Sequence, residues 1–248
     1  MEEKIEPWEI TTNRYVGFID IMGFKDWVAR EDHDIIYKIM KTVSKSIGIT
    51  QGIFGIPSDA ETENYVENIF ITTFSDSIII FSKDGDANTL DSFMGAISTL
   101  SLDLFNYGIP HKGAVAFGKM TVDFEASIFF GQPLIDAYLL EEELAFYGIA
   151  VHSTAEFLNN LKDDENIIEY LCPFKTASAN HLTVTPGITV SDEYDEEDFE
   201  KLKSNVEKLK EKTSGALRKY IDNTLKYLEY VDIQARKIIA EEESETDD

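Results

Sequence analysis

The hydrophobic residues of this chain follow two patterns, short continuous runs and longer stretches with helical spacing. Residues 15–20 form a run without polar alternation, which is typical of a strand covered on both faces. A helix from residue 25 to about residue 49 is predicted by apolar residues that recur at helical spacing: Ile35, Ile36, Ile39, Met40, Val43 and Ile47. The same criteria predict strands at residues 68–74, 77–82, 112–117, 122–130 and 148–151, helices at 90–105, 132–146 and 154–161, a hairpin over 167–190, and two more helices at 199–209 and 217–231.

The order of these elements, β-α-β-β-α-β with additions, is that of a ferredoxin-like fold. We therefore expect an α+β fold with a C-terminal helical extension, in which the first strand lies beside the hairpin of residues 68–82. By composition the chain divides into an N-terminal lead-in (1–13), a folded domain (14–190), an acidic linker with C-terminal helices (191–239), and an acidic tail (240–248) that we expect to be disordered.

The charge of the chain excludes some classes of partner. Its 248 residues include 47 acids and 22 bases, a formal net charge of −25. Such a field repels nucleic-acid phosphates and anionic membranes, so we expect neither nucleic acid nor membrane as a partner. No apolar run approaches the ~20 residues of a spanning helix, and the start Met1-Glu2-Glu3 is unlike a basic signal peptide. With Cys172 as the single cysteine, this predicts a soluble cytoplasmic protein.

Two aspartates stand where predicted strands end. Asp20 ends the first apolar strand, and Asp76 occupies the tip of the hairpin that follows. These positions adjoin in the expected fold, and two carboxylates can bridge a pair of divalent cations ~3.5–4 Å apart, as in two-metal phosphoryl-transfer sites. Oxygen ligands favour Mg²⁺ or Mn²⁺. For either aspartate alone, a role in forming the turn is the alternative interpretation.

The residues after Asp20 suggest which ligand the metal ions would bind together with the protein. Ile21-Met22-Gly23 lead into the predicted helix, and free backbone amides at a helix start favour triphosphate oxygens. A nucleotide bound to so acidic a chain needs metal ions to offset the surrounding charge.

Around these residues the chain resembles the class III nucleotidyl cyclases, over roughly residues 14–160. Residues 18–24 are similar to their first metal motif, F-x-D-I-x-G-F, and Ser75-Asp76-Ser77 resembles the hairpin with their second metal aspartate. Residues 112–118 resemble a basic, glycine-flanked strand, and residues 130–134 the opening of a later catalytic helix. The first motif is fairly specific, and the others are informative through their order.

The chain departs from the purine cyclases of this family at three positions. Ile135 and Leu139 stand where those enzymes carry an Asn and an Arg that stabilise the transition state, and Thr72 stands where a base-reading Lys is common. The pattern is closer to the bacterial pyrimidine cyclases of Pycsar anti-phage systems, which it resembles in Phe74-Ser75-Asp76-Ser77, in Lys112-Gly113 and in G-x-P-L-x-x-A-Y over residues 131–138. That family more often has Arg where Lys112 stands, and lysine lacks the bidentate fork.

The resemblance implies an activity, cofactors and a site. The activity is conversion of UTP to 3′,5′-cyclic UMP and pyrophosphate, as a second messenger for an anti-phage effector, by a cytoplasmic homodimer with two Mn²⁺ or Mg²⁺ ions. The implied catalytic residues are Asp20, Asp76 and Lys112, the metal ligands Asp20, Ile21 and Asp76, and the nucleotide contacts Phe18, Ile21, Gly23, Phe24 and Lys112. Lys112 and residues 131–138 are expected to serve the partner subunit's site, and Leu217, Ile221, Leu225 and Leu228 to add interface.

Other interpretations stay open at this point. A cytidylate cyclase making cCMP fits the same motifs, as does a purine cyclase with an altered site. Ile135 and Leu139 also suit a catalytically silent module that binds nucleotide or a partner, although such a module has no need of the aspartate pair. Taken singly, Lys112 could be a solvent-exposed charge and Tyr138 a core residue. Residues 141–143 are expected to form a solvated helix face. The charge of −25 disfavours a polymerase-like use of the fold.

Overall fold

The structure, a computed structural model, describes residues 8–55, 68–156, 161, 164–187 and 196–246. Its centre is an 8-stranded sheet in the order β2-β3-β1-β4-β6-β8-β7, with β5 paired to β4. The strands are β1 (Thr11–Ile21), β2 (Ile69–Phe74), β3 (Ser77–Ser82), β4 (His111–Asp123), β5 (Ile128–Gly131), β6 (Ile149–Val151), β7 (Ile167–Pro173) and β8 (Ser178–Val184). The half β4-β1-β3-β2 is antiparallel throughout, so the α+β, ferredoxin-like prediction is confirmed.

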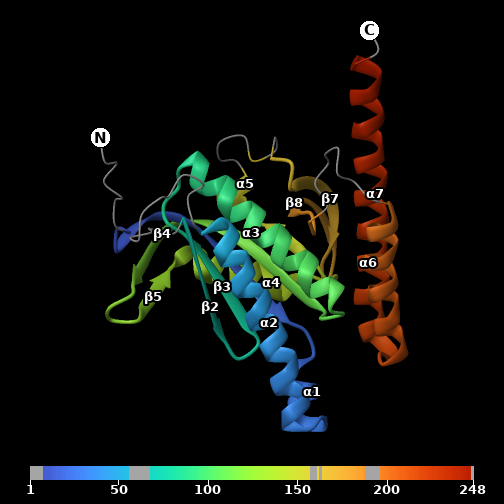
Figure 1. The fold of residues 1–248 in the computed structure, drawn as a ribbon, viewed down its shortest axis with the longest axis horizontal. Helices are drawn as coiled ribbons and strands as arrows, with labels where there is room; N and C mark the ends of the chain where they lie inside the picture. The colour runs from blue at the N-terminus through green and yellow to red at the C-terminus, as the bar shows by residue number, and fades with distance from the viewer. Residues whose placement is uncertain (1–7, 56–67, 157–160, 162–163, 188–195, 247–248) are drawn as a thin grey trace.

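Helices cover both faces of this sheet and one edge (Figure 1). The helices are α1 (Phe24–Arg30), α2 (His33–Phe54), α3 (Ala87–Asn106), α4 (Gln132–Glu143), α5 (Ser153–Glu156), α6 (Glu196–Lys208) and α7 (Arg218–Thr246), with short turns η2 (Leu209–Glu211) and η3 (Gly215–Leu217). Helices α2 and α3 lie on one face and α4 on the other, while α6 and α7 stand beside β7. No helix in the described ranges is both long and apolar enough to cross a membrane.

The central strand β1 is buried on both faces, as its unbroken apolar run predicts. Ile19 and Ile21 point into the core with α2 and α3, where Phe93 and Ile97 of α3 are fully buried. Phe18, one position off, points to the opposite face and packs beneath α4. Because side chains alternate along a strand, Asp20 shares the face of Phe18 and therefore lies on the α4 side.

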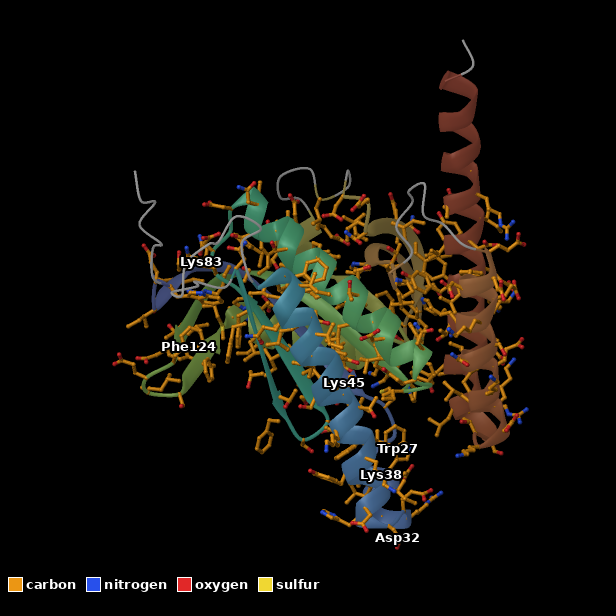
Figure 2. The ribbon with its side chains drawn as sticks, viewed as in Figure 1. Trp27, Asp32, Lys38, Lys45, Lys83 and Phe124 are labelled. Carbon is orange, nitrogen blue, oxygen red and sulfur yellow. The ribbon has the colours of Figure 1, made fainter. Side chains whose placement is uncertain are left out.

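The predicted helix over residues 25–49 is two helices. Five consecutive polar residues, 30–34, interrupt its apolar spacing. Within them Glu31 adopts an extended backbone and Asp32 becomes the N-cap of α2. Aspartate is one of the residues preferred at a helix N-cap, so a new helix begins after Asp32. Figure 2 shows that α1 and the first turns of α2, with Trp27, Asp32 and Lys38, project beyond the sheet. Phe124, at the turn joining β4 to β5, lies at the left of the same view.

The C-terminal helices share a core with the sheet. Ile221, Leu225 and Leu228 of α7 are buried in one cluster with Phe146 and Tyr147, which follow α4. Those three side chains are therefore buried in the core of their own chain. The expectation that they add a subunit interface is wrong. α7 also continues to Thr246, so residues 240–246, predicted to be disordered, are helical in the structure; glutamate is a good helix former. Of the predicted acidic linker, residues 191–198, the part 191–195 lies outside the described residues, and residues 196–198 are the first turn of α6.

Candidate functional site

The two aspartates lie at the same end of the strand pair β1–β3. Asp20 is opposite Ser77 in the antiparallel register. The Ile21 amide donates a 2.9 Å hydrogen bond to the backbone carbonyl of Asp76. The structure thus brings together the two acids that the sequence pattern pairs.

A two-residue loop presents Asp76. Phe74 and Ser77 close the β2–β3 hairpin, and Ser75, the first loop residue, has a φ of 58°. A left-handed φ is uncommon in a residue other than glycine, and such conformations cluster at functional sites. The hairpin therefore holds a tight turn next to Asp20 at some cost in backbone energy.

The surroundings of Asp20 carry more negative than positive charge. Partial burial, together with the negative charges of Glu141 and Asp76, raises the pKa of Asp20 to about 7, and the positive charge of Lys112 offsets only part of this rise. A carboxylate in an acid-rich, partly desolvated position is stabilised by a bound cation. Two carboxylates with the adjacent backbone of Ile21 supply oxygen donors, which fit Mg²⁺ or Mn²⁺. In the described part of the chain, no group of three or more His, Cys, Asp or Glu is placed to hold a metal ion.

Lys112 on β4 lies next to the aspartate pair, but its ammonium bonds to Glu141 on α4. It is the cross-strand partner of Asp20 in the same chain, which corrects the expectation that it serves the partner subunit's site. Its ammonium donates to Glu141 Oε1 at 2.9 Å and to the backbone carbonyl of Glu141 at 2.8 Å. The two side chains are 6% and 4% exposed. A contact between Lys112 and a substrate phosphate stays a prediction.

Glu141 is the residue of the site that the sequence analysis missed. Residues 141–143 were expected to form a solvated helix face, but Glu141 is buried while Glu142 and Glu143 are exposed. The buried residues of α4 are Pro133, Ala137 and Glu141, spaced four apart. This helical spacing is the signal that could have placed Glu141 on the inner face.

Aromatic residues border the aspartates. Phe18 is buried under α4, and its ring meets that of Tyr138 edge-on with centroids 5.5 Å apart. Tyr138, expected in the core, is 42% exposed. The negative charge of Glu142 raises the pKa of Tyr138, and a hydrogen bond to the same carboxylate adds to the effect. A contact between Phe18 and nucleotide stays a prediction.

The segment after Asp20 differs in part from expectation. The amides of Ile21 and Met22 donate to the carbonyls of Asp76 and Pro110, at 2.9 and 2.8 Å, so these two are not free for a triphosphate. Gly23 precedes α1 with a φ of 81°, a conformation that favours glycine. Phe24 is half-buried against the main core. The predicted nucleotide contacts of Gly23 and Phe24 remain untested by this arrangement.

Exposed apolar side chains lie on α4 and on β5. Ile135 and Leu139, at the positions where purine cyclases carry Asn and Arg, are 51% and 52% exposed. Phe130 on β5 is 61% exposed. Ile135 and Leu139 are neighbours one helical turn apart on α4, and adjacent exposed apolar residues commonly mark an interaction surface.

Solved structures with a similar fold include guanylyl cyclases. The guanylyl cyclase Cya2 is 12% identical over 75% of this chain and 96% of its own, with a TM-score of 0.50. The catalytic core of a rhodopsin-guanylyl cyclase with converted specificity, in complex with ATPαS, is 11% identical over 70% of this chain and 96% of its own, also with a TM-score of 0.50. No protein-family model and no curated protein matches the chain. At this identity the likeness establishes a shared fold.

Proposed function

We propose that this chain is a metal-dependent nucleotidyl cyclase. The observation that carries the proposal is the placement of Asp20 beside Asp76, at adjacent strand ends of a fold shared with guanylyl cyclases. The acid-rich surroundings of Asp20, which Lys112 does not balance, support a role in binding cations.

Each feature of the site has a role in this reaction. Asp20, Asp76 and the backbone of Ile21 would hold two Mn²⁺ or Mg²⁺ ions, which when bound supply the charge that acidifies the ribose 3′-OH and binds the triphosphate. The 3′ oxygen forms a bond to the α-phosphorus, the bond from that phosphorus to the β-phosphate oxygen breaks, and pyrophosphate leaves with the electron pair. The 3′-OH proton passes to solvent. The chain contributes position and charge.

The substrate we propose is UTP, converted to 3′,5′-cyclic UMP. Support comes from the resemblance to Pycsar pyrimidine cyclases and from Thr72, half-exposed on β2, where purine cyclases often carry a base-reading Lys. A pocket that hydrogen-bonds one base edge rejects another strongly, because its buried polar groups are then unpaired. CTP, which differs from UTP at position 4, is the alternative substrate. A role of the product as an anti-phage second messenger rests on the same resemblance.

We also propose that the active form is a homodimer. Ile135 and Leu139 are exposed and apolar on α4, and Ile135 lies in the segment 131–138 that the resemblance assigns to the partner subunit's site. A two-fold interface is self-complementary, so one patch serves both chains.

One observation favours a second candidate, a catalytically silent module that binds nucleotide. Ile135 and Leu139 are exposed and apolar where the resemblance expects transition-state donors, so α4 offers neither an amide nor a guanidinium there. The aspartate pair favours the enzyme, because a silent module has no need of it.

Turnover of the four ribonucleoside triphosphates separates these candidates. The purified chain is incubated with Mn²⁺ and ATP, GTP, CTP or UTP, and the products are identified by chromatography and mass. We expect cyclic UMP as the main product. Preferred CTP turnover would change only the base, preferred ATP or GTP turnover would refute the pyrimidine assignment, and binding without turnover would support the silent module.

A further inference from the structure

Asp20 and Lys112 are placed to form an ion pair. They are directly opposite each other in the β1–β4 register, so their side chains leave the same face of the sheet. Cross-strand neighbours of this kind have Cβ atoms ~4.5–5.5 Å apart, and opposite charges at that spacing attract. If that pair formed, it would neutralise one of the two carboxylates on which metal binding depends.

The ammonium of Lys112 points instead to the end of α4. It donates to Glu141 Oε1 at 2.9 Å and to the backbone carbonyls of Glu141 and Glu142 at 2.8 and 3.5 Å. A lysine has three donors, so these acceptors satisfy it. The carbonyls belong to the last turn of α4, where the helix dipole favours a cation. Among the described residues, no ion pair joins Lys112 to Asp20.

Because the Lys112–Glu141 ion pair is buried, loss of Glu141 would change which carboxylate Lys112 bonds to. Removing one member of a buried ion pair leaves an uncompensated buried charge, so the remaining member takes any compensating charge in reach. With Glu141 neutralised, the carboxylate directly across from Lys112 is Asp20.

We propose that Glu141 is a positioning residue that holds Lys112 away from Asp20, and so keeps both carboxylates of the aspartate pair free for a divalent cation. The inference rests on the metal site of the proposed function, and it assigns to α4 a control over that site. The role proposed for Glu141 is the same whichever nucleotide is bound.

The test is the affinity of the full chain for Mn²⁺ alone, measured by electron paramagnetic resonance of the free ion. In Glu141→Gln, Lys112 is released to Asp20, and we expect the Kd for Mn²⁺ to rise at least about tenfold. The double variant Glu141→Gln/Lys112→Met removes both charges and should recover the wild-type Kd. Glu141→Asp keeps the carboxylate and should stay close to wild type.

A neighbouring acid provides the matched control. Glu142→Gln removes the same charge from an exposed position that also acts on Asp20, and should change the Kd less than about fivefold. If the two single variants behave alike, or if the double variant binds as weakly as Glu141→Gln, the inference is overturned. Should Glu141→Gln fail to fold, the double variant decides alone: wild-type affinity supports the inference and weakened affinity refutes it.

Failure of the wider proposal gives a different result. If wild type and Asp20→Asn bind Mn²⁺ equally, the metal site itself is wrong and both proposals fall. If the Mn²⁺ affinities follow the expected order but no triphosphate is turned over, the cyclase assignment fails while the role of Glu141 stands.

Discussion

Asp20 and Lys112 face each other across β1 and β4, yet Lys112 bonds to Glu141 at the end of α4. This arrangement leaves a partly buried carboxylate beside a second one at the β2–β3 hairpin. The β1–β4 pairing and the attachment of α4 therefore matter for the chemistry as much as the aspartates do.

The β1–β4 pairing depends on a glycine next to Lys112. A Cβ at Gly113 would lie 2.6 Å from the backbone oxygen of Phe18, which cannot move without loosening β1. We expect Gly113→Ala to lower the free energy of unfolding by ~1–3 kcal/mol and to reduce turnover. Gly48→Ala is the matched control, because no atom lies within 4 Å of the added methyl in the interior of α2. It should stabilise the fold by ~0.5–1 kcal/mol. Equal effects of the two substitutions in urea unfolding would contradict the register.

The C-terminal helix should behave as part of the core. Leu228 is fully buried and Leu217, just before α7, is 55% exposed. Leu228→Ala should cost ~2–5 kcal/mol of unfolding free energy, because it leaves a cavity between α7 and the sheet. Leu217→Ala should change it by no more than ~0.5 kcal/mol. A two-state urea titration measures both, and a mild effect of Leu228→Ala would show that α7 is not packed as described.

His111 should make stability depend on pH. Burial lowers the pKa of His111 to about 4. The neutral ring donates from Nδ1 to the Ile109 carbonyl at 3.0 Å and accepts at Nε2 from Ser101 at 2.8 Å. The unfolded chain, with a histidine pKa of ~6.5, binds more protons below that pH, so the His111 contribution is complete above pH ~6.5 and is lost as pH falls toward ~4.

The comparison with His111→Gln isolates this effect. The raised pKa of Asp20 acts in the opposite direction, since its protonated form is favoured in the folded state, but it does so in both proteins. Between pH ~7.5 and ~5.5, wild type should lose ~1.4 kcal/mol relative to the variant. Parallel pH profiles for the two proteins would contradict the buried neutral histidine.

Charge placed on the α4 surface should disrupt the proposed dimer. Leu139→Asp puts a carboxylate into the apolar surface and should give a monomer by light scattering, with at least a tenfold loss of turnover, because desolvating an unpaired charge costs at least ~1.4 kcal/mol. Leu171→Asp is the control, a similarly exposed leucine (59%) on β7. If both variants keep the wild-type mass and activity, this surface is not the interface.

The sequence predicts what depends on local pattern. The unbroken apolar run of β1 and the polar tip between β2 and β3 locate Asp20 and Asp76, and the element order makes them neighbours. The break between α1 and α2 coincides with five consecutive polar residues, 30–34, a signal that the prediction of one helix over 25–49 does not use. The partner of Lys112 is Glu141, 29 residues away, and depends on how α4 lies over the sheet. The four-residue spacing from Pro133 and Ala137 indicates that Glu141 is buried. It does not indicate that Lys112 is the residue it contacts.

The most direct test of the central claim is turnover by the two aspartate variants. Asp20→Asn and Asp76→Asn should each lower product formation from UTP and Mn²⁺ by at least about a hundredfold, because each removes a carboxylate shared by the metal ions. Asp91→Asn, an exposed residue of α3, is the matched control and should keep full activity. Circular dichroism of all three should match wild type. Undiminished turnover by a folded Asp20→Asn or Asp76→Asn variant would contradict the claim that these two residues form the active site.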